Sequence, residues 1–295
     1  MILEHDPKAK LTAILWDSVA EPEALAANAS AWKTQLHATQ AMRVFTRGEG
    51  GNRQDWLGAP SVPELQRRLR EGWAEGVQKI EQIATRELSA PASVRRRKTR
   101  GDHGDELDMQ AVWRGDLNRA WSRTKRANRV GTRAVSLVID LCASARVSSD
   151  RLFWRGASAL RLAQLLTESG YAVALYGAFG GNRVDSTGKL NLAQLVEIKS
   201  QDSPLDMDKL AALTAMAGFF RTSLFAGIHY AADQYGHAAD DGLGRPAPEH
   251  IKTAIKMLPV PQNVIIQRNV LDEKAANDWI DEALKQIDTP ELQAA

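Results

Sequence analysis

The amino-acid sequence predicts an α/β protein with three regions. Residues 134–295 alternate short apolar, β-branched runs with longer amphipathic stretches. This alternation is typical of a Rossmann-like three-layer sandwich, in which helices cover both faces of a mainly parallel sheet. Residues 1–90 have the pattern of a mostly helical N-terminal region, and residues 91–133 form a charged connector between the two.

The N-terminal region contains two helix signals. Residues 25–40 are rich in Ala and Leu, which favour helix. A second helix is expected to begin after Ser61, because Ser61 is a good N-cap and Glu64 completes a capping-box pattern. Pro63 falls in the first turn, where a missing N–H is tolerated. Gly72 then predicts a break in this helix.

The connector concentrates positive charge. Residues 95–133 hold 12 Lys or Arg and 5 Asp or Glu, a net charge of +7, so the remainder of the +2 chain carries about −5. Such asymmetry points to a polyanion or an acidic protein surface as partner. The simpler alternative is a solvated connector. Residues 109–126 are expected to form one amphipathic helix capped by Asp108, with Trp113 and Leu117 in its apolar stripe.

The basic residues of the connector are candidate contacts to nucleic-acid phosphates, and such binding weakens steeply with salt. They are Arg95, Arg96, Arg97, Lys98, Arg100, Arg119, Arg123 and Arg126. Trp113 and Trp121 could stack on bases. Their helical spacing, however, favours packing against the rest of the protein.

Strands and helices are expected to alternate in residues 134–295. The expected strands are 134–141, 171–179, 190–200 and 263–267, the third being an antiparallel edge strand. The expected helices are 154–169, 206–217, 223–235, 249–257 and 273–287. Gly170 suits the C-terminal end of the first of these helices. Gly180, Gly181 and Asn182 predict a polar loop after the second strand.

The end of the first predicted strand carries the main candidate site. Asp140 ends this strand, and Ser144 follows four residues later. Ligands of open α/β sheets bind at the carboxyl ends of strands. A carboxylate and hydroxyls at such an end can bind a hard cation such as Mg²⁺. Alternatively, Asp140 caps the following turn and Ser144 bonds to nearby backbone.

The stretch Asp140-Leu141-Cys142-Ala143-Ser144 resembles the Asp-x-Ser-x-Ser motif of the metal-ion-dependent adhesion site in von Willebrand factor A domains. The resemblance implies a Mg²⁺ ion held by Asp140, Ser144 and a threonine at the start of a later helix, which Thr222 matches. Cys142 stands where the family has a metal-coordinating serine, and a thiol is a poor ligand for Mg²⁺.

Two further segments narrow the resemblance. Residues 104–108 resemble the segment before the A domain in cobalt-chelatase-type proteins. The Gly-Trp-x-Glu-Gly motif at 72–76, together with residues 104–133, resembles uncharacterised proteins encoded by phages. These similarities imply a non-enzymatic interaction or assembly module with a degenerate metal site. Its protein partner would be a ring-forming ATPase or a virion component, reached through a cation or, in a decayed site, directly.

Two other classes of function stay open from the residues alone. One is a nucleic-acid-binding protein that uses the basic segment 95–133. The other is a metal-assisted hydrolase, although no acid–base pair can be assigned. Cys142 could be a nucleophile only beside a base, and a buried structural thiol is the expected reading.

Composition limits the cellular setting. No run of 18 apolar residues occurs, so no membrane span is expected. The first residues lack the pattern of a secretory signal. The single cysteine, Cys142, rules out an intrachain disulfide and suits a reducing compartment. We therefore expect a cytoplasmic protein, located in the host cytoplasm or the virion if phage-encoded.

Overall fold

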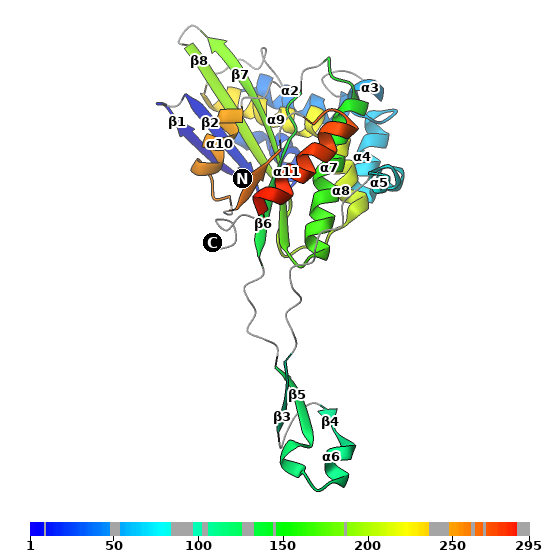
Figure 1. The fold of residues 1–295 in the computed structure, drawn as a ribbon. Coiled ribbons are helices and arrows are strands. Elements are labelled where there is room, and N and C mark those ends of the chain that lie inside the picture. Colours follow the sequence, from blue (N-terminus) through cyan, green and yellow to red (C-terminus); the bar gives the residue numbers. More distant parts are fainter. Residues whose placement is uncertain are drawn as a thin grey trace.

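The fold was obtained as a computed structural model of the chain (Figure 1). The structure describes residues 1–8, 10–47, 54–83, 97–101, 106–125, 133–143, 146–185, 188–235, 248–260, 263–267 and 270–287. Ser144, Arg95, Arg96 and Arg126, which the sequence marks as site residues, lie outside these ranges.

The described residues form a six-stranded sheet and a separate three-stranded sheet. The larger sheet has the order β1-β2-β8-β7-β6-β9, with parallel pairs β2/β8, β7/β6 and β6/β9 and antiparallel pairs β1/β2 and β7/β8. Its strands are β1 (Ile2–Asp6), β2 (Leu11–Trp16), β6 (Ala134–Asp140), β7 (Ala172–Asp185), β8 (Gly188–Lys199) and β9 (Val264–Ile266). The predicted α/β class is confirmed, with a mixed sheet. The predicted strand 190–200 is antiparallel, but β2 and β1 lie beyond it, so it is not an edge strand.

The N-terminal region contributes two strands that the sequence analysis missed. All six residues of β2 are buried, and β2 pairs in parallel with β8 of the second half. Ile14 and Trp16 point to one face of the sheet, whereas Leu11, Ala13 and Leu15 point to the other. Residues 1–90 are therefore joined to the α/β half through one continuous sheet.

Helices cover both faces of this sheet. On one face, α7 (Ser149–Glu168) and α9 (Gly218–Tyr235) pack on Leu137, Ile139 and their neighbours, with α8 (Met207–Ala215) and α11 (Glu273–Ile287) beside α7. On the other face, α10 (Pro248–Met257) packs on residues such as Val138 and Ala193. The result is a three-layer arrangement (Figure 1).

The N-terminal helices form an outer shell on α8 and α9. They are α1 (Glu21–Ala27), η1 (Ala29–Ala31), α2 (Gln35–Arg47), α3 (Gln54–Leu57), α4 (Val62–Glu71) and α5 (Ala74–Glu81). Helix α2 packs on α9, and α4 and α5 pack on α8. The single helix expected over 25–40 is wrong, because Asn28 interrupts it and caps η1. The break at Gly72 is confirmed: this residue has φ +103°, and a Cβ there would lie 2.6 Å from that of Asp208.

Several boundaries in the second half differ from expectation, among them the start of α9 at Gly218 instead of Ser223. Helix α7 begins at Ser149, five residues before the predicted start, and ends before Gly170 at φ +87°, as expected. The polar loop predicted at Gly180-Gly181-Asn182 is wrong, because β7 continues through these residues to Asp185, paired with β8. The two strands pair as a long antiparallel hairpin, and this pairing supplies hydrogen-bond partners for backbone N–H and C=O groups of both strands.

Residues 97–125 form a small unit of their own. It consists of β3 (Arg97–Gly101), β4 (Glu106–Leu107), α6 (Met109–Trp113), η2 (Leu117–Arg119) and β5 (Trp121–Lys125), with sheet order β3-β5-β4. Figure 1 draws it apart from the six-stranded sheet. Asp108 caps α6 as predicted. The helix expected over 109–126 is wrong, because the chain leaves α6 at Gly115, with φ +77°, and returns as a strand.

None of the described helices is by itself long and apolar enough to cross a membrane. Helices α8 and α9 reach the required length and composition only as a pair, which is bent by 64°. Both are buried almost throughout, and a helix surrounded by core is apolar on all sides.

Candidate functional site at the end of strand β6

Asp140 lies at the carboxyl end of β6, as the sequence predicted, but it is buried rather than open. Its side chain is in contact with two groups. One is the backbone of the following turn, so the alternative that Asp140 caps this turn is confirmed, and the other is Arg155, which the sequence analysis did not connect to it. Oδ1 accepts a hydrogen bond from the backbone N–H of Cys142 at 2.9 Å. Nη1 of Arg155 lies 3.9 Å from Oδ1 and donates to the Asp140 carbonyl at 2.9 Å and to the Cys142 carbonyl. Only 5% of either residue is exposed.

Arg155 is held in place by the segment after β9. The Gln267 side chain donates from Nε2 to the Arg155 carbonyl at 2.9 Å and to Oγ of Ser158 at 2.8 Å. The Gln267 backbone N–H donates to the Val138 carbonyl at 2.8 Å. Strand β6, helix α7 and the chain after β9 thus meet in one buried polar cluster. Sequence reasoning missed both residues, because only tertiary packing brings Arg155 of α7 to Asp140 and Gln267 to Arg155.

Cys142 is fully buried beside this cluster. Its Sγ accepts a hydrogen bond from the Gly180 N–H at 3.1 Å. Burial, reinforced by the nearby Asp140 carboxylate, raises the pKa of the thiol well above its usual value. The neutral thiol is therefore the favoured form, and this environment suits the predicted structural role rather than nucleophilic attack.

Thr222 lies in the second turn of α9, which begins at Gly218. Its Oγ1 donates to the Gly218 carbonyl at 2.7 Å, a bond within its own helix. The residue also lines a cavity of about 170 Å³ with Val19 of the β2–α1 loop, Phe45 of α2 and Leu65 of α4. The Thr222 hydroxyl thus has a hydrogen-bond partner within α9, and Thr222 lies on the side of α9 that faces the N-terminal helices.

The surroundings of Asp140 fit a Mg²⁺ ion poorly. The ion needs oxygen ligands and keeps several waters, whereas a guanidinium stands beside this buried carboxylate. Two like charges would compete for one carboxylate at close range. No group of three or more His, Cys, Asp or Glu within the described ranges is placed to hold a metal ion. The magnesium site stays a prediction that needs a direct test.

The candidate nucleic-acid residues fall on several elements instead of one helix face. Arg97, Lys98 and Arg100 are in β3 and Arg123 is in β5, whereas Arg119 ends η2. The β3/β5 register pairs Arg97 with Lys125 and Thr99 with Arg123. The two strands thus bring the two basic segments of the connector side by side.

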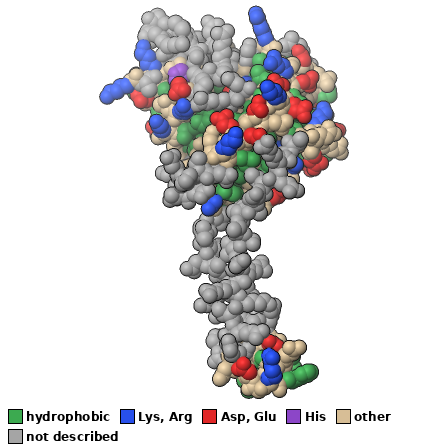
Figure 2. Space-filling view, in the orientation of Figure 1, with side chains coloured by type: hydrophobic (Ala, Val, Ile, Leu, Met, Phe, Trp, Pro, Cys, Tyr) green, Lys and Arg blue, Asp and Glu red, His purple; other side chains and the backbone are tan. Residues whose placement is uncertain are grey.

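The small unit exposes four large apolar side chains, which we name together the 107–117 patch. Its members are Leu107, Met109, Trp113 and Leu117, which are 43%, 51%, 82% and 62% exposed. Figure 2 shows hydrophobic side chains at the surface of this unit. The expectation that Trp113 and Leu117 pack inward is wrong, because α6 ends at Trp113 and both side chains are exposed, whereas Ala111 is the buried residue of this helix.

A second surface feature is a groove of about 1070 Å³ beside the start of α7. Its lining includes Ser149 and Phe153 of α7, Arg68 of α4 and Trp73. Trp73 makes an edge-on contact with Phe153 at 6.2 Å and carries the Arg68 guanidinium over its ring at 5.7 Å. The aromatic rings and the cation in this wall are therefore already in contact with one another.

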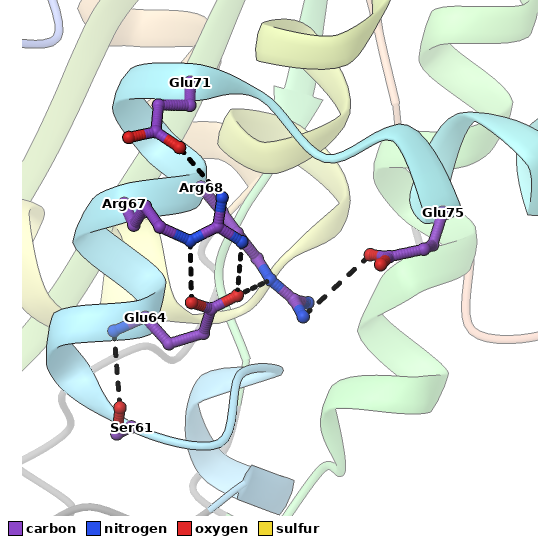
Figure 3. A network of polar contacts seen from close by, with 6 residues as sticks. All are labelled: Ser61, Glu64, Arg67, Arg68, Glu71 and Glu75. Carbon is purple, nitrogen blue, oxygen red and sulfur yellow. Dashed lines mark hydrogen bonds and ion pairs between the residues drawn. The ribbon is translucent and has the colours of Figure 1, made fainter.

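Arg68 and Glu75, which line this groove, belong to a network of charged residues on and beside α4 (Figure 3). Ser61 caps α4 as predicted, accepting from the Glu64 N–H at 3.3 Å. The Glu64 carboxylate accepts from Arg67 at 2.8 and 2.9 Å and from Arg68 at 2.6 Å. Hydrogen bonds from Arg67 and Arg68 lower the pKa of Glu64 to about 2. Arg67 also reaches Glu71 at 2.8 Å, and Arg68 lies 3.9 Å from Glu75.

Fold and site together define an α/β protein with a mixed central sheet, a buried ion pair at a strand end and a small apolar-faced side unit. A family model described as "Domain of unknown function (DUF7192)" matches residues 12–291, so the chain belongs to this family. No curated protein and no solved structure matches the chain.

Proposed function

We propose that the protein is a non-enzymatic interaction or assembly module related in design to von Willebrand factor A domains, and that it binds its partner through the 107–117 patch. The run β8-β7-β6-β9, with β8 antiparallel and Asp140 at the end of an inner strand, supports the comparison with A domains. The resemblance suggests a ring-forming ATPase or a virion component as partner, and a cytoplasmic setting.

The observation that carries this proposal is the exposure of Trp113. Large exposed aromatic and Met side chains are enriched at protein interfaces, and Trp is a frequent centre of binding energy. Trp113 is 82% exposed, with three further apolar side chains exposed in the same unit. Several large apolar side chains exposed together are typical of an interaction surface, whereas a single exposed apolar residue needs no explanation.

The charge of the surrounding segment suggests what the partner offers. Residues 95–133 carry a net charge of +7. An apolar surface rimmed by acidic residues would match the apolar side chains of the patch and the positive charge around them. The long-range attraction between opposite charges would also speed association. Asp140 and Arg155 serve in this proposal as an internal ion pair that fixes the strand-end loop, with no metal needed.

The test is capture of partners from the native source with matched variants. Trp113→Ser and Leu117→Ser should each reduce recovery of an acidic protein about tenfold or more, as loss of an interface centre does. Leu36→Ser is the control, because Leu36 is 65% exposed on α2, away from the patch. Equal recovery with all three variants would overturn the proposal.

Nucleic-acid binding is the second candidate, favoured by the juxtaposition of basic strand β3 with basic strand β5 and by the exposed Trp113. Bases stack on exposed aromatic rings in proteins that bind single strands. Titration with a fluorescent single-stranded oligonucleotide should then show affinity that falls steeply with salt. If nuclease treatment leaves the captured partner bound, the result favours binding of a partner protein over binding of nucleic acid.

A further inference from the structure

Strand β9 ends the six-stranded sheet in the order of the described strands. It pairs in parallel with β6 on one side only. The hydrogen bonds at its two ends fix which of its residues face β6. The Ser136 N–H donates to the Asn263 carbonyl at 3.1 Å, and the Gln267 N–H donates to the Val138 carbonyl at 2.8 Å.

These two bonds also fix the direction of the remaining backbone groups. In a parallel ladder, alternate residues of a strand bond to one neighbour, and the residues between them face the opposite side. Asn263, Ile265 and Gln267 therefore bond toward β6. The N–H and C=O groups of Val264 and Ile266 point the other way, off the outer edge of β9.

A groove of about 550 Å³ lies along this outer edge. Its apolar lining comes from Val264, Ile266, Ala275 and Trp279, so strand β9 and helix α11 both contribute. Lys252 of α10 also lines it. Because α10 and α11 lie on opposite faces of the sheet, the groove occupies the position that a seventh strand would take. Its volume lies within the range of about 300–1,000 Å³ typical of binding sites.

The charges in the groove suggest which side chains an added strand would carry. Asp278 and Glu282 line it one turn apart on α11, a spacing at which like charges repel. Lys252, the cation across the groove, lies 3.6 Å from Glu249 of its own helix. A basic side chain entering the groove would relieve the repulsion between the two carboxylates.

We propose that the outer edge of β9 binds an extended segment of a partner protein by strand addition. The segment carries apolar side chains in alternation with Lys or Arg. Its backbone bonds to Val264 and Ile266, its apolar side chains pack on Trp279, and its cations pair with Asp278 and Glu282. Main-chain bonds supply affinity in this mode, and alternate side chains supply specificity. This surface is separate from the 107–117 patch, and either proposal can fail alone.

The test uses a displayed library of random seven-residue peptides selected on the full chain. Ile266→Pro removes one outward N–H and leaves the ladder to β6 intact, because proline is tolerated at such edge positions. Ile266→Ala is the matched control for the lost side chain. Selected peptides should alternate apolar and basic residues and bind Ile266→Pro at least tenfold more weakly than Ile266→Ala. Equal binding to the two variants would overturn the proposal.

Two further measurements keep the proposal testable if Ile266→Pro folds poorly. Asp278→Asn with Glu282→Gln should weaken the selected peptides about tenfold, whereas Glu273→Gln, on the same helix but lining the groove beside α7, should not. Hydrogen exchange of the Val264 and Ile266 amides should slow when peptide is added. Unchanged exchange at both, or self-association of the chain through β9 in place of peptide binding, would contradict the proposal.

Discussion

At the residue scale, close backbone contacts explain several small residues in the core. Gly156 of α7 faces α8, and a Cβ built on it would lie 2.2 Å from the Thr214 carbonyl carbon. Gly227 of α9 faces the buried pair of Trp16 and Gln194, whose side chains are joined by a 3.1 Å hydrogen bond. Helices α7 and α9 therefore approach their neighbours more closely than a methyl group would allow.

Replacing Gly156 by Ala should destabilise the protein. The added methyl would force α7 and α8 apart, and overpacking of this kind costs about 1–3 kcal/mol. Urea unfolding measures the change. Arg151→Ala at an exposed position of the same helix is the control, expected to stay within about 0.5 kcal/mol of wild type. A stable Gly156→Ala variant would show that the helices can separate without cost.

The buried pair of Asp140 and Arg155 should behave as a coupled unit. Arg155→Met removes the buried cation beside this carboxylate, and breaking a buried pair costs about 3–5 kcal/mol. Adding Asp140→Asn removes the carboxylate charge as well, so the double variant should lose less than the sum of the single losses. A double-mutant cycle by urea unfolding gives the coupling. Additive effects would mean that the two groups do not interact.

Cys142 should be inert in the folded protein. The thiol is fully buried, and its raised pKa keeps it protonated at neutral pH. Reaction with a coloured disulfide reagent at pH 8 should therefore proceed only as fast as the protein unfolds, and completely in urea. Rapid, stoichiometric reaction of the native protein would contradict this prediction and would support the alternative that Cys142 is the nucleophile of a hydrolase.

At the element scale, strong amphipathic periodicity predicted some helices well. The helix expected at 273–287 agrees residue for residue with α11, and Ser61 was recognised as the start of α4. The helix expected at 109–126 failed although its apolar residues have helical spacing. The helix ends at Trp113, and Gly115, two residues later, turns the chain away at φ +77°. Spacing alone does not show whether apolar residues pack inward or stay exposed.

Glu64 of α4 should make the stability of the protein depend on pH in the acid range. Its pKa of about 2 lies below the ordinary value of 4.5, so the ionised carboxylate is favoured by folding. This contribution is complete above about pH 4.5 and is lost as the pH falls toward 2. Glu64→Gln should therefore flatten the pH dependence of unfolding in this window.

Glu249→Gln is the control for Glu64→Gln, because the exposed Glu249 carboxylate of α10 lies 3.6 Å from the exposed ammonium group of Lys252. Acid unfolding followed by circular dichroism at several pH values compares the two variants. If Glu64→Gln keeps the wild-type slope between pH 4.5 and 2, the arginine network of α4 does not hold the carboxylate in its charged form.

At the scale of the whole molecule, the sequence indicated the class of fold but not how its parts join. Strand β2 was missed because a six-residue apolar run, Leu11–Trp16, fits a strand or a buried helix equally well. Its partner β8 lies about 180 residues later, beyond the reach of local patterns. The position of Asp140 at a strand end was predictable from local sequence. Its pairing with Arg155 was not, since it depends on tertiary packing.

We propose that Arg155, and not a metal ion, neutralises the Asp140 carboxylate, and that the exposed 107–117 patch carries partner binding. Thermal melting with and without Mg²⁺, at matched ionic strength, tests this most directly, because an ion that binds the folded state raises the melting temperature. We expect the same melting temperature for wild type in both conditions. A rise in wild type that disappears in Asp140→Asn would contradict the claim and restore the strand-end metal site.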